Sequence, residues 1–151
     1  MSVGDGIRLS EFEETQTEEL VAMWRASFEH GVGILDPHPI SEQRDYFLKR
    51  VLPENTVLVA TSAESIVGFV AASPTSIAQL YVHVDHLRKG IGTRLVEWAK
   101  QNSGGSLWLY TFECNRVAQR FYERHGFVIV ERGVEEMWKL RDLKYSWSAG
   151  G

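Results

Sequence analysis

The segment HLRKGIGTRLV, residues 86–96, sets two glycines and several cationic side chains ahead of a helical pattern. Gly90 and Gly92 let backbone N–H groups approach a ligand closely, and the positive end of a helix dipole favours an anion there. Charge suited to phosphate oxygens comes from neighbouring cations, namely Arg88, Lys89 and Arg94. The segment predicts a diphosphate site, with a turn that only satisfies backbone geometry as the open alternative.

Two better-known phosphate motifs are absent. A dinucleotide-binding fingerprint needs a further glycine where the chain has Leu95, and no GxxxxGK[ST] segment occurs. A second candidate lies in NRVAQRFYERHGF, where Asn115 and Tyr122 are seven residues apart. On a helix they share one stripe about 10 Å long, so one ligand can reach both. The alternatives are a plain N-cap for Asn115 and a half-buried core residue for Tyr122.

The elements that must position these residues follow from hydrophobic periodicity. Amphipathic helices are expected after Thr15, after Ser41 as far as Pro53, from Gly90, and over 115–126. Apolar and β-branched runs predict seven strands, at 7–10, 56–60, 65–73, 76–84, 107–112, 127–132 and 135–147. The order β-α-α-β-β-β-α-β-α-β-β predicts a mixed α+β fold with a mostly antiparallel sheet flanked by helices. We expect one domain over 1–151, with a frayed tail over 147–151.

Composition restricts the function classes. The net charge of −4 gives no global positive field for nucleic acid or membranes, so any anion site is local. The only cysteine, Cys114, cannot form an internal disulfide, which favours a reducing compartment. Without a leader-like start or an apolar run of about 18 residues, a cytoplasmic protein is expected. The segment HVDH, residues 83–86, is too small a cluster to predict a metal.

Together, LYVHVDHLRKGIGTRLVEWA and NRVAQRFYERHGF resemble the GNAT superfamily of acyl-CoA-dependent N-acyltransferases. The first matches the family segment (Q/R)xxGx(G/A), except that Leu87 stands at the Gln/Arg position. The second matches NxxAxxFYxxxGF throughout. The resemblance implies the GNAT fold and an acyl-CoA site with these cofactor-binding residues: Leu80, Tyr81, Val82, Arg88, Lys89, Gly90, Ile91, Gly92, Thr93 and Asn115. It also implies that a strand N–H polarises the thioester carbonyl and favours a homodimer.

The resemblance makes Tyr122 the catalytic candidate, because a phenol is protonated at neutral pH and can donate to the departing thiolate. It assigns the acceptor to the first helices, their loop and the last two strands, with Trp24, Phe28 and His30 as substrate-binding candidates and Trp138 and Tyr145 opposite. No residue declares itself as the general base. Four side chains stay open for that role, namely Glu29, His30, His83 and Glu113, beside ordered water.

These patterns predict an N-acetyltransferase that uses acetyl-CoA as co-substrate, without a metal, to acetylate a primary amine by direct nucleophilic attack. The acceptor class stays open between a small molecule and a peptide or protein amine. The alternatives are a non-catalytic acyl-CoA-binding or regulatory module and a general nucleotide-binding module. The retained Tyr122 favours catalysis.

Overall fold

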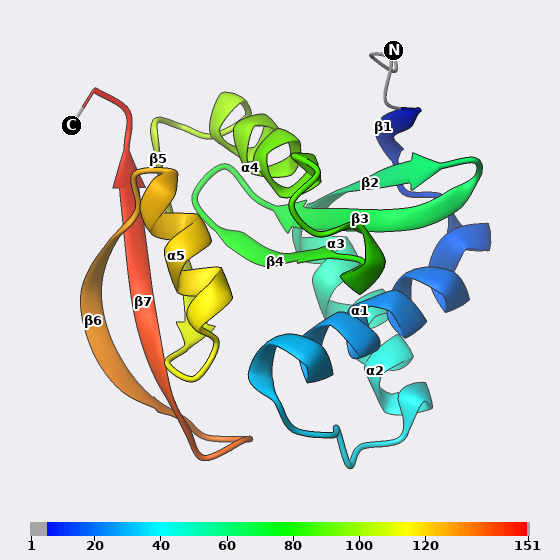
Figure 1. Cartoon of the computed structure of the whole chain (residues 1–151), viewed down its shortest axis with the longest axis horizontal. Coiled ribbons are helices and arrows are strands. Elements are labelled where there is room, and N and C mark those ends of the chain that lie inside the picture. Colours follow the sequence, from blue (N-terminus) through cyan, green and yellow to red (C-terminus); the bar gives the residue numbers. More distant parts are fainter. Residues whose placement is uncertain (1–5, 151) are drawn as a thin grey trace.

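The computed structural model describes residues 6–150 and contains two antiparallel sheets (Figure 1). The first has the order β1-β2-β3-β4 and the second β5-β7-β6. Strand bounds are β1 Ile7–Glu11, β2 Thr56–Ser62, β3 Ser65–Ala72, β4 Ile77–Val82, β5 Ser106–Phe112, β6 Val128–Glu135 and β7 Leu140–Ser148. Strands β2, β3 and β4 form an antiparallel meander, in agreement with the mostly antiparallel sheet that the sequence predicts.

Helices connect the strands in the expected order. The first is α1 (Thr17–Val32), and a continuous helical stretch follows: α2 (Ile40–Tyr46), a π turn (Phe47–Val51) and α3 (Leu52–Glu54). After β4, a 3₁₀ turn (Val84–His86) leads to α4 (Ile91–Gln101), and α5 (Arg116–Arg124) follows β5. Gly126 adopts φ +87° just after α5, as its position in the sequence predicts.

The first sheet is buried on both faces because apolar side chains occupy successive positions of β2 and β3. Leu58 and Ala60 face one core with α4, α5, β5 and β7. Val57 and Val59 face the other core, which α1 and the π turn complete. Because successive side chains of a strand point to opposite faces, each apolar run supplies side chains to both cores.

Local boundaries differ from the sequence-based predictions in several places. The α2 helix begins at Ile40 with Pro39 as its cap, so Ser41 is not the cap, and the helical stretch continues through Pro53 to Glu54. The α1 helix is preceded by a 3₁₀ turn whose capping box joins Glu13 and Gln16, so Thr15 is not the cap. Trp138 lies in the turn between β6 and β7, since β7 starts only at Leu140. Residues 147 and 148 are paired with β5 rather than frayed, and residue 151 lies outside the described residues.

Candidate active site

The centre of the candidate site is the opening between β4 and β5. Among residues 6–150 these strands share one parallel bridge, Ser76 with Trp108, and Trp108 N–H donates to the Thr75 carbonyl at 3.1 Å. Beyond that point they diverge toward the lower part of Figure 1, with α5 in front of the second sheet. This opening between β4 and β5 is called the splay.

The open edge of β4 exposes the backbone groups of alternate residues. His83 N–H donates to Val67 O at 2.8 Å, and the antiparallel alternation then directs the backbone of Tyr81 toward β3 and that of Leu80 and Val82 away from it. The Val82 carbonyl already accepts a hydrogen bond from the Ser27 hydroxyl of α1 at 2.9 Å. The groups that remain for a ligand are the Leu80 N–H and carbonyl and the Val82 N–H.

The glycine turn after β4 is shaped as an anion cradle. Arg88 and Gly90 have φ of 63° and 81°, and no heavy atom lies within 4 Å of the place where a Gly90 Cβ would sit. Arg94 N–H makes the first helical bond, to Gly90 O at 3.1 Å, so the preceding N–H groups of α4 have no helical partner. The N–H groups without a helical partner are those of Ile91, Gly92 and Thr93, which the GNAT resemblance assigns to the diphosphate of acyl-CoA.

The cations of the turn divide into two groups. Arg88 and Lys89 are exposed, and neither forms an ion pair within residues 6–150. Arg94 is directed elsewhere, since its guanidinium donates to the Ile7 carbonyl at 3.4 Å. Side-chain charge for phosphate is therefore expected from Arg88 and Lys89 alone.

The two glycines serve different purposes. A Cβ on Gly92 would lie 3.0 Å from Phe121 Cε1, so this glycine permits close packing of α4 against α5. The next residue, Thr93, has its hydroxyl 3.2 Å from the His125 Nε2 atom. Burial, followed by the charge of Lys100, lowers the pKa of His125 and favours its neutral ring. These contacts join the turn to the helix that carries Tyr122.

Asn115 caps α5 and still has a side-chain group available for a ligand. Its Oδ1 accepts the Ala118 N–H at 3.2 Å and caps α5. Its Nδ2 lies so close to Gly31 of α1 that a Cβ there would be 2.8 Å away, yet it makes no hydrogen bond within the described residues. The cap and the predicted cofactor contact are thus compatible, because they use different atoms.

Tyr122 is fixed in position by packing and not by hydrogen bonding. It is 7% exposed, with rings of Phe127 and Tyr145 centred 5.6 and 6.3 Å away. Its hydroxyl makes no hydrogen bond within residues 6–150, whereas Tyr145 donates to a Glu123 carboxylate oxygen at 2.8 Å. Burial, and to a smaller extent the phenol of Tyr81, raises the pKa of Tyr122 well above its usual range. The phenol is therefore protonated and available.

The acceptor candidates lie at different depths. Trp24 and Phe28 are 7% and 8% exposed and belong to the core between α1 and the first sheet. His30 is exposed on the same helix. Tyr81 packs against Trp24, and burial, partly offset by a hydrogen bond with Trp24, raises the pKa of Tyr81 to about 12. Of the opposite pair, Trp138 packs on Phe28, while Tyr145 is wholly buried beside Tyr122.

A charged cluster that the sequence did not indicate joins the α1–α2 loop to α1. Asp36 accepts from the Arg25 guanidinium at 3.3 Å and contacts the His38 ring at 2.8 Å. The Arg25 guanidinium also donates to the His38 carbonyl, and the His38 ring meets Trp138 edge-on at 5.2 Å. An Asp-x-His spacing after the helix was the only signal available. The cluster fixes the loop beside the β6–β7 hairpin.

Asp36→Asn is expected to destabilise this loop. Burial raises the pKa of Asp36, but the hydrogen bonds from the His38 backbone and ring and the charge of Arg25 outweigh burial and lower it. A lowered pKa means that this stability is present above the ordinary value near 4 and is lost as pH falls through the folded-state value. The substitution should cost about 1–3 kcal/mol at pH 7.

The measurement is thermal unfolding of both proteins at pH 7 and pH 3. The gap in midpoint, about 2–9 °C at pH 7 for a chain of this size, should shrink at pH 3. At that pH the Asp36 carboxyl of the unfolded chain is mostly protonated, so part of the charge-dependent stability is lost. A gap that does not change with pH would show that the charge of Asp36 is not what stabilises the loop.

The four base candidates are mostly engaged elsewhere. Glu29 accepts the Asp36 N–H at 2.7 Å, and Glu113 lies 3.8 Å from Arg132. His83 Nδ1 accepts the Asp85 N–H at 3.1 Å, and only His30 has no partner within the described residues. None of them is shown beside Tyr122. Within residues 6–150, no group of three or more His, Cys, Asp and Glu side chains is arranged to hold a metal ion.

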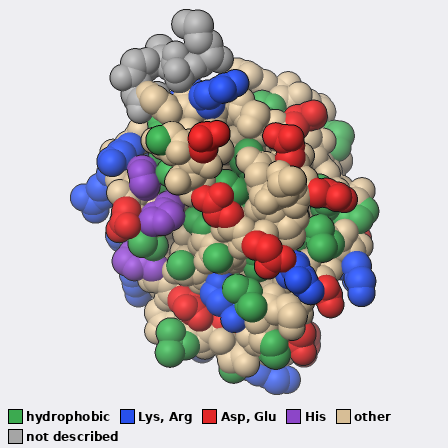
Figure 2. All heavy atoms as spheres, turned by 90° about the vertical axis from the view of Figure 1, so that its right-hand side faces the viewer, with side chains coloured by type: hydrophobic (Ala, Val, Ile, Leu, Met, Phe, Trp, Pro, Cys, Tyr) green, Lys and Arg blue, Asp and Glu red, His purple; other side chains and the backbone are tan. Residues whose placement is uncertain are grey.

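The face of the molecule shown in Figure 2 has no broad field of one sign, because acidic and basic side chains are interspersed there. No helix within residues 6–150 is long and apolar enough to cross a membrane.

Comparison with known proteins identifies the family. The model of the acetyltransferase (GNAT) domain matches residues 53–129, which include β2 to α5 and thus the whole splay and turn. The chain belongs to the GNAT acetyltransferases. It is 31% identical over 135 residues to peptidyl-lysine N-acetyltransferase YjaB of Salmonella typhimurium, covering 88% of this chain and 90% of that protein.

Solved GNAT structures superpose on nearly the whole chain. Apo-form YjaB from Escherichia coli has a TM-score of 0.78 at 26% identity, covering 95% of this chain and 99% of that one. PaiA N-acetyltransferase from Thermoplasma acidophilum, solved with coenzyme A, has a TM-score of 0.73 at 19% identity, covering 98% and 99%. The predicted fold class is confirmed, and this GNAT protein is an acetyl-CoA-dependent N-acetyltransferase.

Proposed function

We propose that this GNAT acetyltransferase transfers the acetyl group of acetyl-CoA directly to the side-chain amine of a peptidyl lysine. The observation that carries the proposal is the Tyr122 phenol, which is buried, protonated and without a hydrogen-bond partner in the described structure. A free donor of this kind, on the helix beside the splay, suits a reaction that must protonate a thiolate. The lysine acceptor is inferred from the related YjaB.

The proposed cofactor track uses the chain's own groups in sequence. The N–H groups at the start of α4, with Arg88 and Lys89, hold the diphosphate. The Leu80 backbone and the Asn115 amide hold the pantetheine arm, and the Val82 N–H is the proposed donor to the thioester oxygen, where negative charge develops during attack. Acetyl-CoA supplies an activated carbonyl and a thiolate leaving group. Within residues 6–150 none of the four base candidates contacts Tyr122, and ordered water is proposed to take the amine proton.

The test is a panel of small amines, antibiotics and lysine peptides incubated with acetyl-CoA. Product should be followed by mass, because the exposed thiol of Cys114 would react with thiol-detecting dyes. We expect acetylation of the lysine amine in peptides above the rate without enzyme. Acetylation of small amines alone would contradict the peptidyl acceptor, and binding of acetyl-CoA without acetylation of any amine would contradict the reaction.

The pH profile should be set by the acceptor. A lysine amine has an ordinary pKa near 10.4, so kcat/KM at low acceptor concentration should rise about tenfold per pH unit between pH 7 and 9. Because the pKa of Tyr122 is raised, its proton stays in place throughout that range. No falling limb is expected below about pH 10.

The measurement is the initial rate with one lysine peptide at saturating acetyl-CoA, with circular dichroism at each pH as the control for folding. A decline of the rate between pH 8 and 9.5, in protein that remains folded, would show that the proton donor titrates there. That result would contradict the role proposed for Tyr122.

A further inference from the structure

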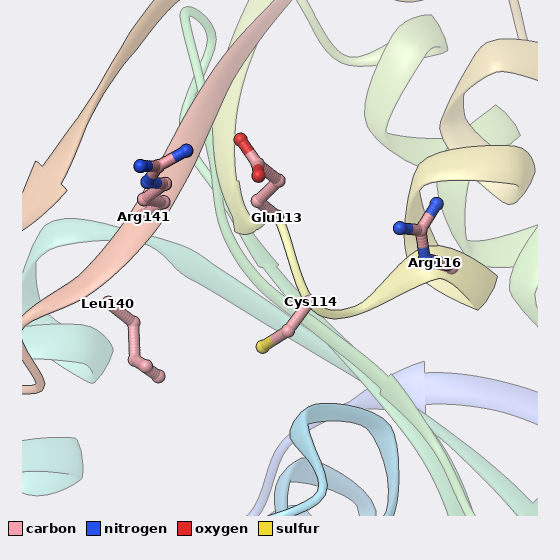
Figure 3. A pocket seen from close by; sticks show the side chains of 5 residues that line it. All are labelled: Glu113, Cys114, Arg116, Leu140 and Arg141. Carbon is pink, nitrogen blue, oxygen red and sulfur yellow. The ribbon is translucent and has the colours of Figure 1, made fainter.

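An open cavity of about 300 Å³ lies where β5 ends, lined by Glu113, Cys114, Arg116, Leu140 and Arg141 (Figure 3). In this view Arg141 and Arg116 lie on opposite sides of Glu113 and Cys114. The cavity joins two strands of the second sheet to the first turn of α5, because the Glu113 N–H donates to Arg141 O at 2.9 Å. The backbone that carries the lining is therefore fixed.

The position of the cavity relates it to the acceptor. The Cys114 Sγ atom is 3.6 Å from the Val32 carbonyl, at the end of α1. Leu140 packs against the core that contains Phe28 and Trp138. The cavity thus borders the α1–α2 loop and the β6–β7 hairpin. These are the elements from which the GNAT resemblance builds the acceptor side.

The charge in the cavity is unbalanced. Arg116 and Arg141 are exposed, and neither guanidinium group makes a hydrogen bond or an ion pair within residues 6–150. The Glu113 carboxylate does not neutralise them, because the cation within ion-pair distance of it is Arg132 of β6, at 3.8 Å. Two guanidinium groups are therefore left to face solvent across one cavity.

Several carboxylates on the surrounding elements make hydrogen bonds or ion pairs within the chain. Glu29 accepts from the Asp36 backbone, Asp36 pairs with Arg25, and Glu135 accepts the Trp138 N–H at 2.6 Å. Glu136 and Lys139 at the hairpin turn are unpaired in the described structure and offset each other. Within residues 6–150, the guanidinium groups of Arg116 and Arg141 therefore have no ion-pair partner, in a chain whose net charge is −4.

We infer that this cavity binds a carboxylate of the acceptor, so that the preferred substrate is a peptide whose reactive lysine has an acidic neighbour. Guanidinium groups recognise carboxylates by charge-assisted hydrogen bonds. Arg116 and Tyr122 are six residues apart on α5, about 9 Å along the axis. That distance is spanned by about two or three extended residues. The inference rests on the proposed acetylation of peptide amines.

The experiment compares matched peptides with one lysine, flanked two and three positions away by Glu, by Gln or by Arg, each with an amidated C-terminus. A further Gln peptide with a free C-terminal carboxylate, two residues beyond the lysine, separates a terminal from a side-chain carboxylate. We expect kcat/KM for the Glu peptide to exceed that for the Gln peptide about five- to tenfold. The difference should lie in KM, and 0.5 M salt should reduce it.

Substitutions of the cavity arginines test whether the preference for the Glu peptide arises at this cavity. Arg141→Gln should bring the Glu-to-Gln ratio close to one, and Arg141→Glu should reverse the preference toward the Arg-flanked peptide. The matched control is Arg8→Gln, on exposed β1 and remote from the cavity, which should leave the ratio unchanged. Circular dichroism checks that each variant is folded.

Equal rates on the Glu and Gln peptides in the original protein would overturn the inference and leave the proposed function intact. A preference that survives unchanged in both Arg141→Gln and Arg116→Gln would also overturn it, since the carboxylate would then bind elsewhere. Acetylation of small amines with none of any peptide would contradict the inference together with the peptidyl acceptor.

Discussion

Tyr122→Phe is expected to lower kcat/KM by about 10²- to 10³-fold, because it removes the proton that the departing thiolate receives. The substitution retains the ring that packs between Phe127 and Tyr145. It breaks no hydrogen bond within the described residues, so the unfolding midpoint should change little. Steady-state kinetics with a lysine peptide, and calorimetry with acetyl-CoA, measure the two effects separately.

The affinity for acetyl-CoA should stay within about threefold, a change of less than 1 kcal/mol. Tyr110→Phe is the matched control, since Tyr110 is exposed on β5 and its ring contacts Trp108 on the outer surface. Loss of activity below about fivefold in folded Tyr122→Phe would reject Tyr122 as the proton donor. An equal loss of acetyl-CoA binding would instead assign the residue to cofactor binding.

Gly90→Val is expected to weaken acetyl-CoA binding by about 10- to 100-fold, the equivalent of one or two lost charge-assisted hydrogen bonds. A valine at φ +81° strains the turn, and its side chain would fill the open space above the α4 amides. The strain itself should cost about 1–2 kcal/mol of the free energy of unfolding. Calorimetric titration with acetyl-CoA and thermal unfolding give the two values.

Gly92→Val provides the contrast, because a Cβ there meets Phe121 at 3.0 Å. Overpacking of this kind costs about 1–3 kcal/mol, so stability should fall at least as much as in Gly90→Val. If Gly90→Val lowered stability and affinity by equal free energies, the glycine would serve only the backbone geometry of the turn. If Gly90→Val lost stability but bound acetyl-CoA with unchanged affinity, Gly90 would have no role in binding the phosphate groups.

Much of the fold was predictable because its signals are local. The apolar runs in β2 and β3, the period of α4 and the glycine after α5 each depend on residues close in sequence. Element boundaries were less predictable. The run over residues 135–147 reads as one strand, and nothing in it indicates the turn that contains Trp138. The position of Trp138 in that turn is what brings it to Phe28 and His38.

The substrate side was the least predictable. The GNAT resemblance makes Trp24 and Phe28 acceptor candidates. Helix periodicity cannot distinguish a residue that lines a binding site from a residue of the core, and both side chains are buried. The Arg25–Asp36–His38 cluster was not predicted, since its members acquire a role only when the loop folds back on α1. The unpaired arginines of the cavity come from two elements that are distant in sequence.

The sequence by itself determined the element order, the glycine turn and the stripe from Asn115 to Tyr122, because each depends on spacing within one helix or turn. Only the tertiary structure decided which atoms are left for ligands. Ser27 takes the Val82 carbonyl across 55 residues, and Arg94 turns to Ile7 across 87. Asn115 caps α5 with one atom and leaves another free beside Gly31. Whether a backbone or side-chain group is available to a ligand depends on partners that are distant in sequence, and local spacing carries no information about those partners.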